Sequence, residues 1–220
     1  LGGNHFLSKF DMSKGYYALK LTDASKKYTT FTTANRGLYM FNVMPFGLSS
    51  APASFTRVMR KLLGGTENLD FYLDDVLAHT DGWKAHVETL RVFFTRVRTA
   101  NLALKPSKCK IGCTTIDFLG HRVVEDCKIP NPDNLGKIIE AARPETKKHI
   151  KSLLGSCGFY QSYIPRYSDI VTPLTDCLKK AMPNRVFWGE KQEHSFQLLK
   201  KAFLSGPVLK LVSIDKPFVL

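Results

Sequence analysis

The sequence lacks the segments that would place a chain in or across a membrane. Its 220 residues contain no uninterrupted apolar run of about 18 residues, the length that a spanning helix needs. The first residues lack the basic, apolar and small-residue stages of a signal peptide. They also open without methionine, directly into sequence that we expect to be structured. We therefore expect no membrane partner, and we interpret the chain as a fragment of a longer polypeptide.

Cysteine is scarce, and its count of five is odd. The spacing does not match a secreted disulfide framework, so we expect a reducing, intracellular compartment. Cys109 and Cys113 could form a zinc site with His121 and Cys127. However, two cysteines separated by three residues and followed by unevenly spaced partners are a weak zinc pattern. Free cysteine is also a common small core residue.

Acidic residues are few: 19 stand against 32 lysines and arginines, for a net charge of +13. The excess lies mainly between Lys84 and Lys210, where 22 basic residues face 11 acidic ones, a net +11. A basic surface releases counterions from a phosphate backbone, so this distribution favours a nucleic-acid partner. The alternative is a solvated basic surface that only aids solubility.

The first 130 residues predict a mixture of strands and helices. A strand is expected at 6–10, ending at Asp11, and a hairpin is expected from 27–33 and 38–43. Two short strands at 71–72 and 76–77 are expected to flank an acidic turn. A strand pair or one bent strand is expected at 116–124. A helix capped by Ser50 is expected to run to Gly64-Gly65 with an apolar face. A second helix, capped by Asp81, is expected to bury a stripe of apolar residues, namely Trp83, Val87, Leu90, Phe94 and Val97.

After residue 130 the sequence predicts successive helices at about 133–142, 145–163, 168–181 and 189–204, and then a strand-like end at 217–220. Strands mixed with helices and followed by a helical segment indicate an α+β fold with an appended helical module.

Three aspartates suggest phosphoryl-transfer chemistry. Asp11 ends one predicted strand, and Asp74 and Asp75 occupy a predicted turn between two apolar strands. Adjacent carboxylates in such a setting repel each other unless cations are present. Three such groups could hold two Mg²⁺ ions. The alternative is an ordinary surface turn, where Asp is common.

Four ordered motifs give the chain a resemblance to a known family. Tyr72-Leu-Asp-Asp75 resembles the Tyr-x-Asp-Asp box of reverse transcriptases, and Phe10-Asp11-Met-Ser-Lys-Gly15-Tyr16 resembles their first acidic motif. Met44-Pro-Phe-Gly-Leu-Ser-Ser-Ala-Pro-Ala-Ser-Phe55 is similar to the nucleotide-pocket motif of gypsy-type LTR retrotransposons. Phe118-Leu-Gly-His121, preceded by Leu104-Lys-Pro-Ser-Lys-Cys109, resembles their primer-grip segment.

The second half continues the resemblance. Leu154-Gly-Ser-Cys-Gly-Phe-Tyr160 and the segment to Ser168 resemble the thumb, and the stretch from Phe187-Trp188 to Leu209 resembles the approach to a ribonuclease H domain. Arg143 departs from the pattern, because an aromatic residue often stands before this proline in the family.

The resemblance implies a role for each motif. Asp11, Asp74, Asp75 and the carbonyl of Met12 would bind two Mg²⁺ ions, for which Mn²⁺ could substitute. Tyr16 would exclude a ribose 2′-hydroxyl, and the loop of Pro45, Phe46 and Gly47 would line the pocket of the incoming nucleotide. Some retroviral relatives carry Gln where this chain has Phe46, so packing would replace a hydrogen bond. The implied primer contacts are Tyr72, Leu119, Gly120 and His121.

The resemblance further implies a right-hand polymerase fold with an antiparallel-sheet palm, partial fingers and a helical thumb. The expected domains are a palm with partial fingers at 1–130, a thumb at 131–183 and the start of a truncated ribonuclease H domain at 184–220. The implied activity is RNA-directed DNA polymerisation, which extends a primer on an RNA or DNA template with deoxynucleoside triphosphates. The implied location is the cytoplasm, within virus-like particles.

The sequence leaves alternatives to the expected activity open. This fragment alone could be inactive, because part of the fingers is missing from it. The chain could also be an inactive nucleic-acid-binding relic of such an element. A two-metal nuclease would explain the aspartates but not the nucleotide-pocket motif.

Overall fold

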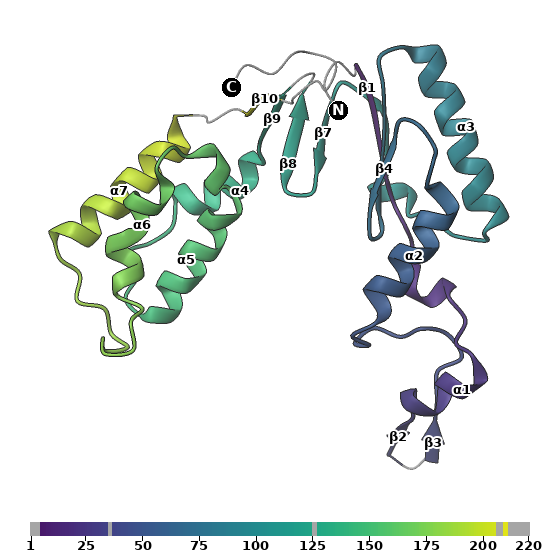
Figure 1. Ribbon diagram of the computed structural model, residues 1–220, viewed down its shortest axis with the longest axis horizontal. Helices are drawn as coiled ribbons and strands as arrows, with labels where there is room; N and C mark the ends of the chain where they lie inside the picture. The colour runs from purple at the N-terminus through teal and green to yellow at the C-terminus, as the bar shows by residue number, and fades with distance from the viewer. Residues whose placement is uncertain (1–4, 35–36, 125–126, 206–208, 211–220) are drawn as a thin grey trace. The chain divides into compact units, whose positions relative to one another are not determined.

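The computed structural model describes residues 5–34, 37–124, 127–205 and 209–210 (Figure 1). Contacts divide the chain into two compact units, one ending at Phe118 and one beginning at Leu119. No helix within the described residues combines the length and the apolar character that crossing a membrane requires. The strand at 217–220 and the hairpin turn at 35–36 that we predicted lie outside these ranges.

The first unit is built on an antiparallel sheet with the strand order β4-β5-β1-β6. Its strands are β1 (Phe6–Asp11), β4 (Leu69–Tyr72), β5 (Asp75–Thr80) and β6 (Lys110–Cys113). A further strand, β7 (Thr115–Phe118), follows β6. A two-stranded hairpin of β2 (Phe31–Thr33) and β3 (Gly37–Tyr39) follows the short helices α1 (Asp23–Lys26) and η2 (Lys27–Thr29). The predicted hairpin is therefore present but shorter than expected.

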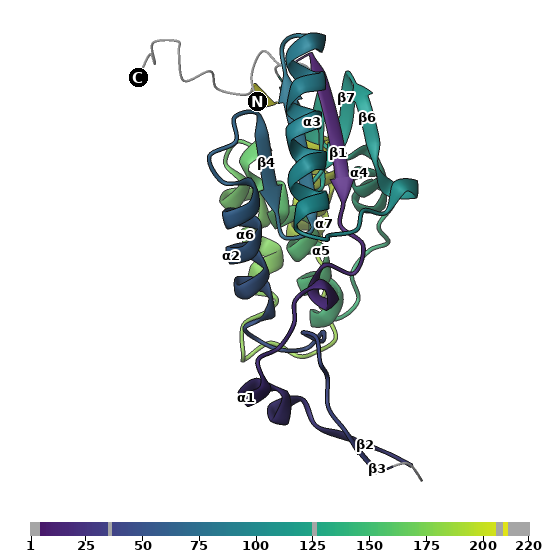
Figure 2. The ribbon, with the colours of Figure 1, turned by 90° about the vertical axis from the view of Figure 1, so that its right-hand side faces the viewer.

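Two helices, α2 (Ala51–Leu63) and α3 (Trp83–Thr99), bury their apolar residues against this sheet. Figure 2 shows α3 lying over the sheet between β4 and β1. The centre of this core is aromatic: Phe10 and Phe93 are fully buried and stack with ring centroids 4.4 Å apart, and Phe55 is also fully buried. The helices therefore cover one face of the strands that carry the aspartates.

Of the two predicted helix caps, the position of Ser50 is confirmed and that of Asp81 is wrong. Ser50 stands at the N-cap of α2, but its side chain makes no capping hydrogen bond. The N-cap of α3 is Gly82, and not Asp81.

The predicted buried stripe of α3 is also partly wrong. Leu90 and Val97 are buried as expected, but Trp83, Val87 and Phe94 are 53%, 36% and 37% exposed. The helix turns His86 inward instead. His86 is fully buried because Ser8 Oγ lies 2.7 Å from its Nε2 and Thr80 Oγ1 lies 3.0 Å from its Nδ1. A polar partner on each side lowers the free-energy cost of burying this ring.

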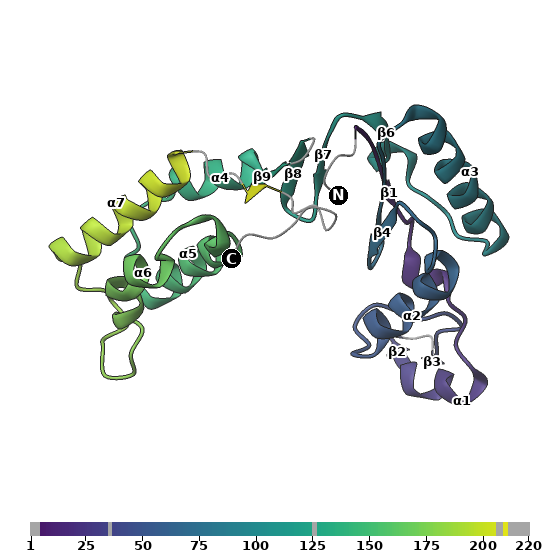
Figure 3. The ribbon, with the colours of Figure 1, turned by 45° about the horizontal axis from the view of Figure 1, so that its top comes forward.

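The second unit begins with the strands β8 (His121–Val124), β9 (Cys127–Pro130) and β10 (Leu209–Lys210), which pair antiparallel. Its helices are α4 (Pro132–Ile139), α5 (Lys147–Phe159), α6 (Tyr167–Asp176) and α7 (Glu190–Leu204). Figure 3 shows these helices gathered in one cluster. Side-chain oxygens of Asn131 and Thr146 cap α4 and α5 by accepting from the backbone N–H groups of Asp133 and His149. The prediction of an α+β fold with antiparallel strands is confirmed.

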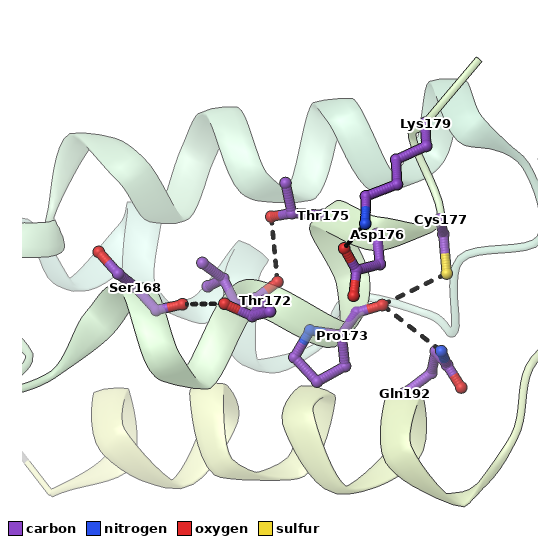
Figure 4. A network of polar contacts seen from close by, with 9 residues as sticks. Ser168, Thr172, Pro173, Thr175, Asp176, Cys177, Lys179 and Gln192 are labelled. Atoms are coloured by element: carbon purple, nitrogen blue, oxygen red, sulfur yellow. Dashed lines mark hydrogen bonds and ion pairs between the residues drawn. The ribbon is translucent and has the colours of Figure 1, made fainter. Parts of the chain in front are cut away.

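Helix α6 contains Pro173, whose carbonyl accepts two hydrogen bonds from outside the usual ladder (Figure 4). The donors are Cys177 Sγ at 3.4 Å and Gln192 Nε2 at 3.4 Å. Because Gln192 belongs to α7, this contact joins α6 to α7.

Helix α7 shares its core with the helices of the predicted thumb. Phe196, Leu199 and Phe203 of α7 are buried together with Ile150 and Leu174. The division after Phe118 also differs from the predicted boundary at 130/131. The assignment of 1–130, 131–183 and 184–220 to palm, thumb and ribonuclease H parts stays a prediction.

Arg143, which stands where the family often has an aromatic residue, packs against an aromatic ring. Its guanidinium lies over the ring of Trp188 at 5.1 Å. The indole Nε1 of Trp188 donates to Glu193 Oε2 at 2.6 Å. Hydrogen bonds from Gln197 and Trp188 hold the pKa of Glu193 below its ordinary value. The arginine thus links the start of α7 to the segment that precedes α5.

Candidate active site

Asp11 and Asp75 lie opposite each other on neighbouring strands. Asp11 is the last residue of β1 and Asp75 the first of β5, and they are partners in the antiparallel register. Partners on the same face of such a pair have Cβ atoms about 4.5–5.5 Å apart. The predicted strand therefore places the carboxylate of Asp11 next to the acidic turn.

Asp74 occupies a two-residue turn between β4 and β5, which is closed by the pairing of Tyr72 with Asp75. The prediction that Asp75 also lies in the turn is wrong, because Asp75 is the first residue of β5. Leu73, the first residue of the turn, has a φ of +52°. This left-handed conformation is uncommon for a residue with a branched side chain. The backbone N–H of Met12 donates to the carbonyl of Asp74 at 3.0 Å, which ties the end of β1 to the turn. All three aspartates are therefore held at one corner of the sheet.

Two lysines supply positive charge at this corner. Lys9 Nζ lies 3.0 Å from Asp75 Oδ1, and Lys108 Nζ lies 3.0 Å from Asp11 Oδ2. The pKa of Lys108 is raised, first by its hydrogen bond to Asp11 and by the charge of that carboxylate, and further by the charges of Asp74 and Asp75. One ammonium group thus lies within electrostatic reach of all three carboxylates.

The donor atoms at this corner suit a hard divalent cation, because carboxylate and carbonyl oxygens are the ligands that Mg²⁺ prefers. Within the described ranges, no three His, Cys, Asp or Glu side chains are already arranged as metal ligands. Asp11 and Asp75 instead each face an ammonium group. Met12 is 3% exposed with its side chain in the core, so only its main chain could face a cation. The metal-binding role of these four residues stays a prediction.

The predicted nucleotide-pocket residues form an aromatic group. Tyr16 lies in the short helix η1 (Gly15–Ala18). Its ring lies 5.2 Å from that of Phe46 and 5.5 Å from that of Phe55. Phe46 is 63% exposed, whereas Pro45 before it is buried. Gly47 has a φ of +95° and open space around it. The structure thus brings Tyr16 and Phe46 together, with the outer ring facing solvent.

The predicted primer contacts lie in two different units. Tyr72 is an exposed residue of the first unit, opposite Asp75 in the hairpin. Leu119, Gly120 and His121 open the second unit. The ring of His121 is half-buried, and its Nδ1–H donates to the carbonyl of Leu119 at 3.0 Å. Burial lowers the pKa of His121.

Sequence reasoning missed both lysines at the acidic corner. Lys9 could have been found, because it lies two residues before Asp11 and alternate residues of a strand share a face. Lys108 lies in the segment that precedes the primer-grip motif, and the resemblance implies no role for it. It is 97 residues from its partner Asp11, so no local spacing points to the pair.

All five cysteines are free thiols. Burial raises the pKa of Cys157 to about 12. This thiol therefore stays protonated and behaves as a small apolar core residue.

Comparison with known proteins identifies the family. Residues 1–123 match the family described as reverse transcriptase (RNA-dependent DNA polymerase). The chain is 34% identical over 224 residues to the retrovirus-related Pol polyprotein from transposon 297 of Drosophila melanogaster, and it covers 21% of that protein. It is 27% identical over 220 residues to the transposon Tf2-3 polyprotein of Schizosaccharomyces pombe, of which it covers 16%. The chain thus spans about a fifth or less of the length of these relatives. The first match covers 100% of the chain itself and the second covers 99%.

Solved structures share the fold. A foamy viral protease-reverse transcriptase in complex with double-stranded DNA superposes with a TM-score of 0.91 at 23% identity, over 98% of this chain and 38% of that one. A foamy viral protease-reverse transcriptase in complex with an RNA/DNA hybrid gives a TM-score of 0.89 at 24% identity, over 96% of this chain and 29% of that one. The expected polymerase fold and the resemblance to retrotransposon reverse transcriptases are confirmed. The chain belongs to the reverse transcriptase (RNA-dependent DNA polymerase) family.

Proposed function

We propose that the chain is the polymerase part of a retrotransposon polyprotein and extends a primer on an RNA template with deoxynucleoside triphosphates. The observation that carries the proposal is the acidic corner, where Asp11 faces Asp75 across two strands and the turn places Asp74 beside them. Family membership supports this activity. The relatives are polyproteins of which the chain spans a fifth or less, so we propose that it works within a longer polypeptide.

Reverse transcriptases generally use divalent metals, and we propose two Mg²⁺ ions here, with Mn²⁺ as a possible substitute. Asp11, Asp74, Asp75 and the carbonyl of Met12 would hold them. When bound, such ions activate the attacking 3′-hydroxyl and neutralise charge on the leaving pyrophosphate. Lys9 and Lys108 supply the counter-charge that the carboxylates otherwise need.

The aromatic group beside the acidic corner fits a nucleotide site. We propose that the ring of Tyr16 packs under the sugar and excludes a 2′-hydroxyl by bulk. Its contacts with Phe46 and Phe55 hold the ring in one place. The loop of Pro45, Phe46 and Gly47 would then line the base side of the pocket, where exposed Phe46 offers an apolar surface.

We further propose that template and primer bind through phosphate contacts. The net charge of +13 supports this, as do the nucleic acids bound by the foamy viral enzymes. Tyr72, Leu119, Gly120 and His121 would contact the primer. We also propose a cytoplasmic location within virus-like particles, on the basis of the transposon relatives.

Primer extension on an RNA template tests the proposal. We expect the polypeptide that carries this chain to add deoxynucleotides to a DNA primer, to stop when a chelator is added and to resume with Mg²⁺. Binding of template and primer without extension would instead support an inactive relic. Cleavage without extension would support a two-metal nuclease.

A further inference from the structure

The turn of Leu119 and Gly120 has an unusual backbone. Leu119 has a φ of +48° and Gly120 a φ of +76°. Left-handed conformations are costly for Leu, which lacks the local side-chain hydrogen bonds that help Asn or Asp there. Something outside the turn must therefore stabilise this conformation.

The stabilising contacts come from α4, α5 and the segment before α4, all within the second unit. The hydroxyl of Tyr160, the residue after α5, donates to the carbonyl of Gly120 at 2.7 Å. Asn134 Nδ2 donates to the same hydroxyl at 3.1 Å. The backbone N–H of Asn131 also donates to the carbonyl of Gly120, at 3.1 Å. One carbonyl of the turn is thus held from two directions.

Aromatic rings close around the same turn. A Cβ atom at Gly120 would lie 2.9 Å from Phe159 Cε1, so only glycine fits here without a shift. The ring of His121 lies 5.2 Å from that of Phe159 and 5.6 Å from that of Tyr160. Tyr160 itself is 2% exposed, which shields its hydrogen bond from water.

We infer that Tyr160 is a positioning residue, which sets the Leu119–Gly120 turn through its hydroxyl. The inference rests on the proposed function insofar as this turn contacts the primer. The hydroxyl fixes the carbonyl of Gly120 by its hydrogen bond. It thereby holds Leu119 and Gly120 in their left-handed conformations, which set the direction of the Leu119 side chain and of the His121 backbone. A primer end must be placed within fractions of an ångström for efficient transfer, so a looser turn slows the reaction.

A neighbouring tyrosine allows the effect of the hydroxyl to be separated from the effect of the ring. Tyr163 is also buried, at 6% exposed, and its ring stacks on the same His121 at 5.7 Å. Its hydroxyl has no hydrogen-bond partner in the described part of the chain. Tyr160 and Tyr163 therefore form a matched pair that differs in the contact of interest.

The first arm of the test measures the turn itself. Tyr160→Phe keeps the ring, and the carbonyl of Gly120 keeps its bond from Asn131, so the variant should fold. Losing one buried hydrogen bond should speed amide hydrogen exchange at Asn131 about fivefold. Tyr163→Phe should leave this rate unchanged. This arm needs no catalytic activity, so it tests the positioning contact even if the proposed polymerase function fails.

The second arm measures single-turnover primer extension by the polypeptide that carries the chain. We expect Tyr160→Phe to lower the extension rate about fivefold, with the nucleotide KM and the affinity for template and primer changed less than about twofold. Tyr163→Phe should match the wild type. If wild type extends no primer, the proposed function fails and the exchange arm alone decides the positioning role. If exchange at Asn131 is unchanged in Tyr160→Phe, or if both variants behave alike, the inference is overturned.

Discussion

Replacing Tyr16 with alanine separates the two roles that its position allows. As a gate, the ring excludes a 2′-hydroxyl from the nucleotide site. As a packing residue, it only supports the core beside η1, where it contacts Phe46 and Phe55. The two roles predict different outcomes for the same variant.

The stability cost can be estimated from the contacts of the ring. Truncating a fully buried aromatic residue to alanine costs about 3–5 kcal/mol. Tyr16 is only partly buried, and each of its two ring contacts is worth about 0.5–1.5 kcal/mol. We therefore expect a loss of about 2 kcal/mol in the free energy of unfolding, or about 4–8 °C in Tm for a chain of this size.

The effect on sugar selectivity is separate from this loss of stability. Rejecting one extra group of about this size in a tight pocket is worth about 10-fold to 200-fold. Removal of the ring should lower the preference for deoxy- over ribonucleotides by about tenfold or more, mainly by admitting the wrong sugar.

The assay is incorporation of matched deoxy- and ribonucleotides by each variant, together with a melting curve. Tyr17→Ala is the control, because Tyr17 is adjacent and its ring also lies close to Phe46, at 5.4 Å. Tyr16→Phe should retain the selectivity, since it keeps the bulk. An unchanged ratio of the two efficiencies in Tyr16→Ala, with earlier melting, would refute the gate and leave Tyr16 as a packing residue.

The remaining predictions concern burial, packing at two glycines and charge. Burial, and then the charge of His79, hold the pKa of His86 below the ordinary 6.5, so the unfolded state takes up the proton first. The free energy of unfolding should therefore fall as pH drops from about 6.5 toward the lower folded pKa, and His86→Gln should flatten this slope in melting curves. Gly15→Ala would place a Cβ atom 2.7 Å from Phe55 Cζ and should cost about 1–3 kcal/mol in denaturant unfolding. Gly155→Ala in α5, with open space around it, should instead stabilise by about 0.5–1 kcal/mol. Affinity for template and primer should fall steeply with salt and depend little on sequence, and a flat salt dependence in a binding titration would contradict the phosphate contacts.

Local patterns predicted the elements best where one periodicity was unambiguous. The strand that ends at Asp11 and the helix that ends at Gly64 are observed within a residue of their expected bounds. Phe55, Met59 and Leu63 of that helix are buried, as its apolar face predicted. These features depend on alternation and on turn residues, which are local properties of the sequence.

Features that depend on tertiary partners could not be predicted. The apolar stripe predicted that Trp83 and Phe94 face the core, and no local pattern pointed to the burial of His86. His86 is buried because Ser8, from a distant strand, offers it a partner, whereas Trp83 and Phe94 stay partly exposed. The pairing of Lys108 with Asp11 likewise depends on how the strands are ordered in the sheet.

The acidic corner was only partly predictable. The hairpin of Tyr72 and Asp75 follows from apolar strands around an acidic turn. The left-handed Leu73 does not, because the turn has no glycine or asparagine to signal it. The roles of these residues came from the family motifs.

The most direct test of the account is primer extension on an RNA template by Asp74→Asn. This change removes the negative charge and keeps the shape of the side chain and the carbonyl that accepts from Met12. The matched control is Asp70→Asn, on the same hairpin, where the carboxylate pairs with His79 at 3.3 Å. The account predicts that Asp74→Asn loses extension by about 100-fold or more with an unchanged circular dichroism spectrum, while Asp70→Asn retains it. Extension at the wild-type rate by Asp74→Asn would contradict the central claim.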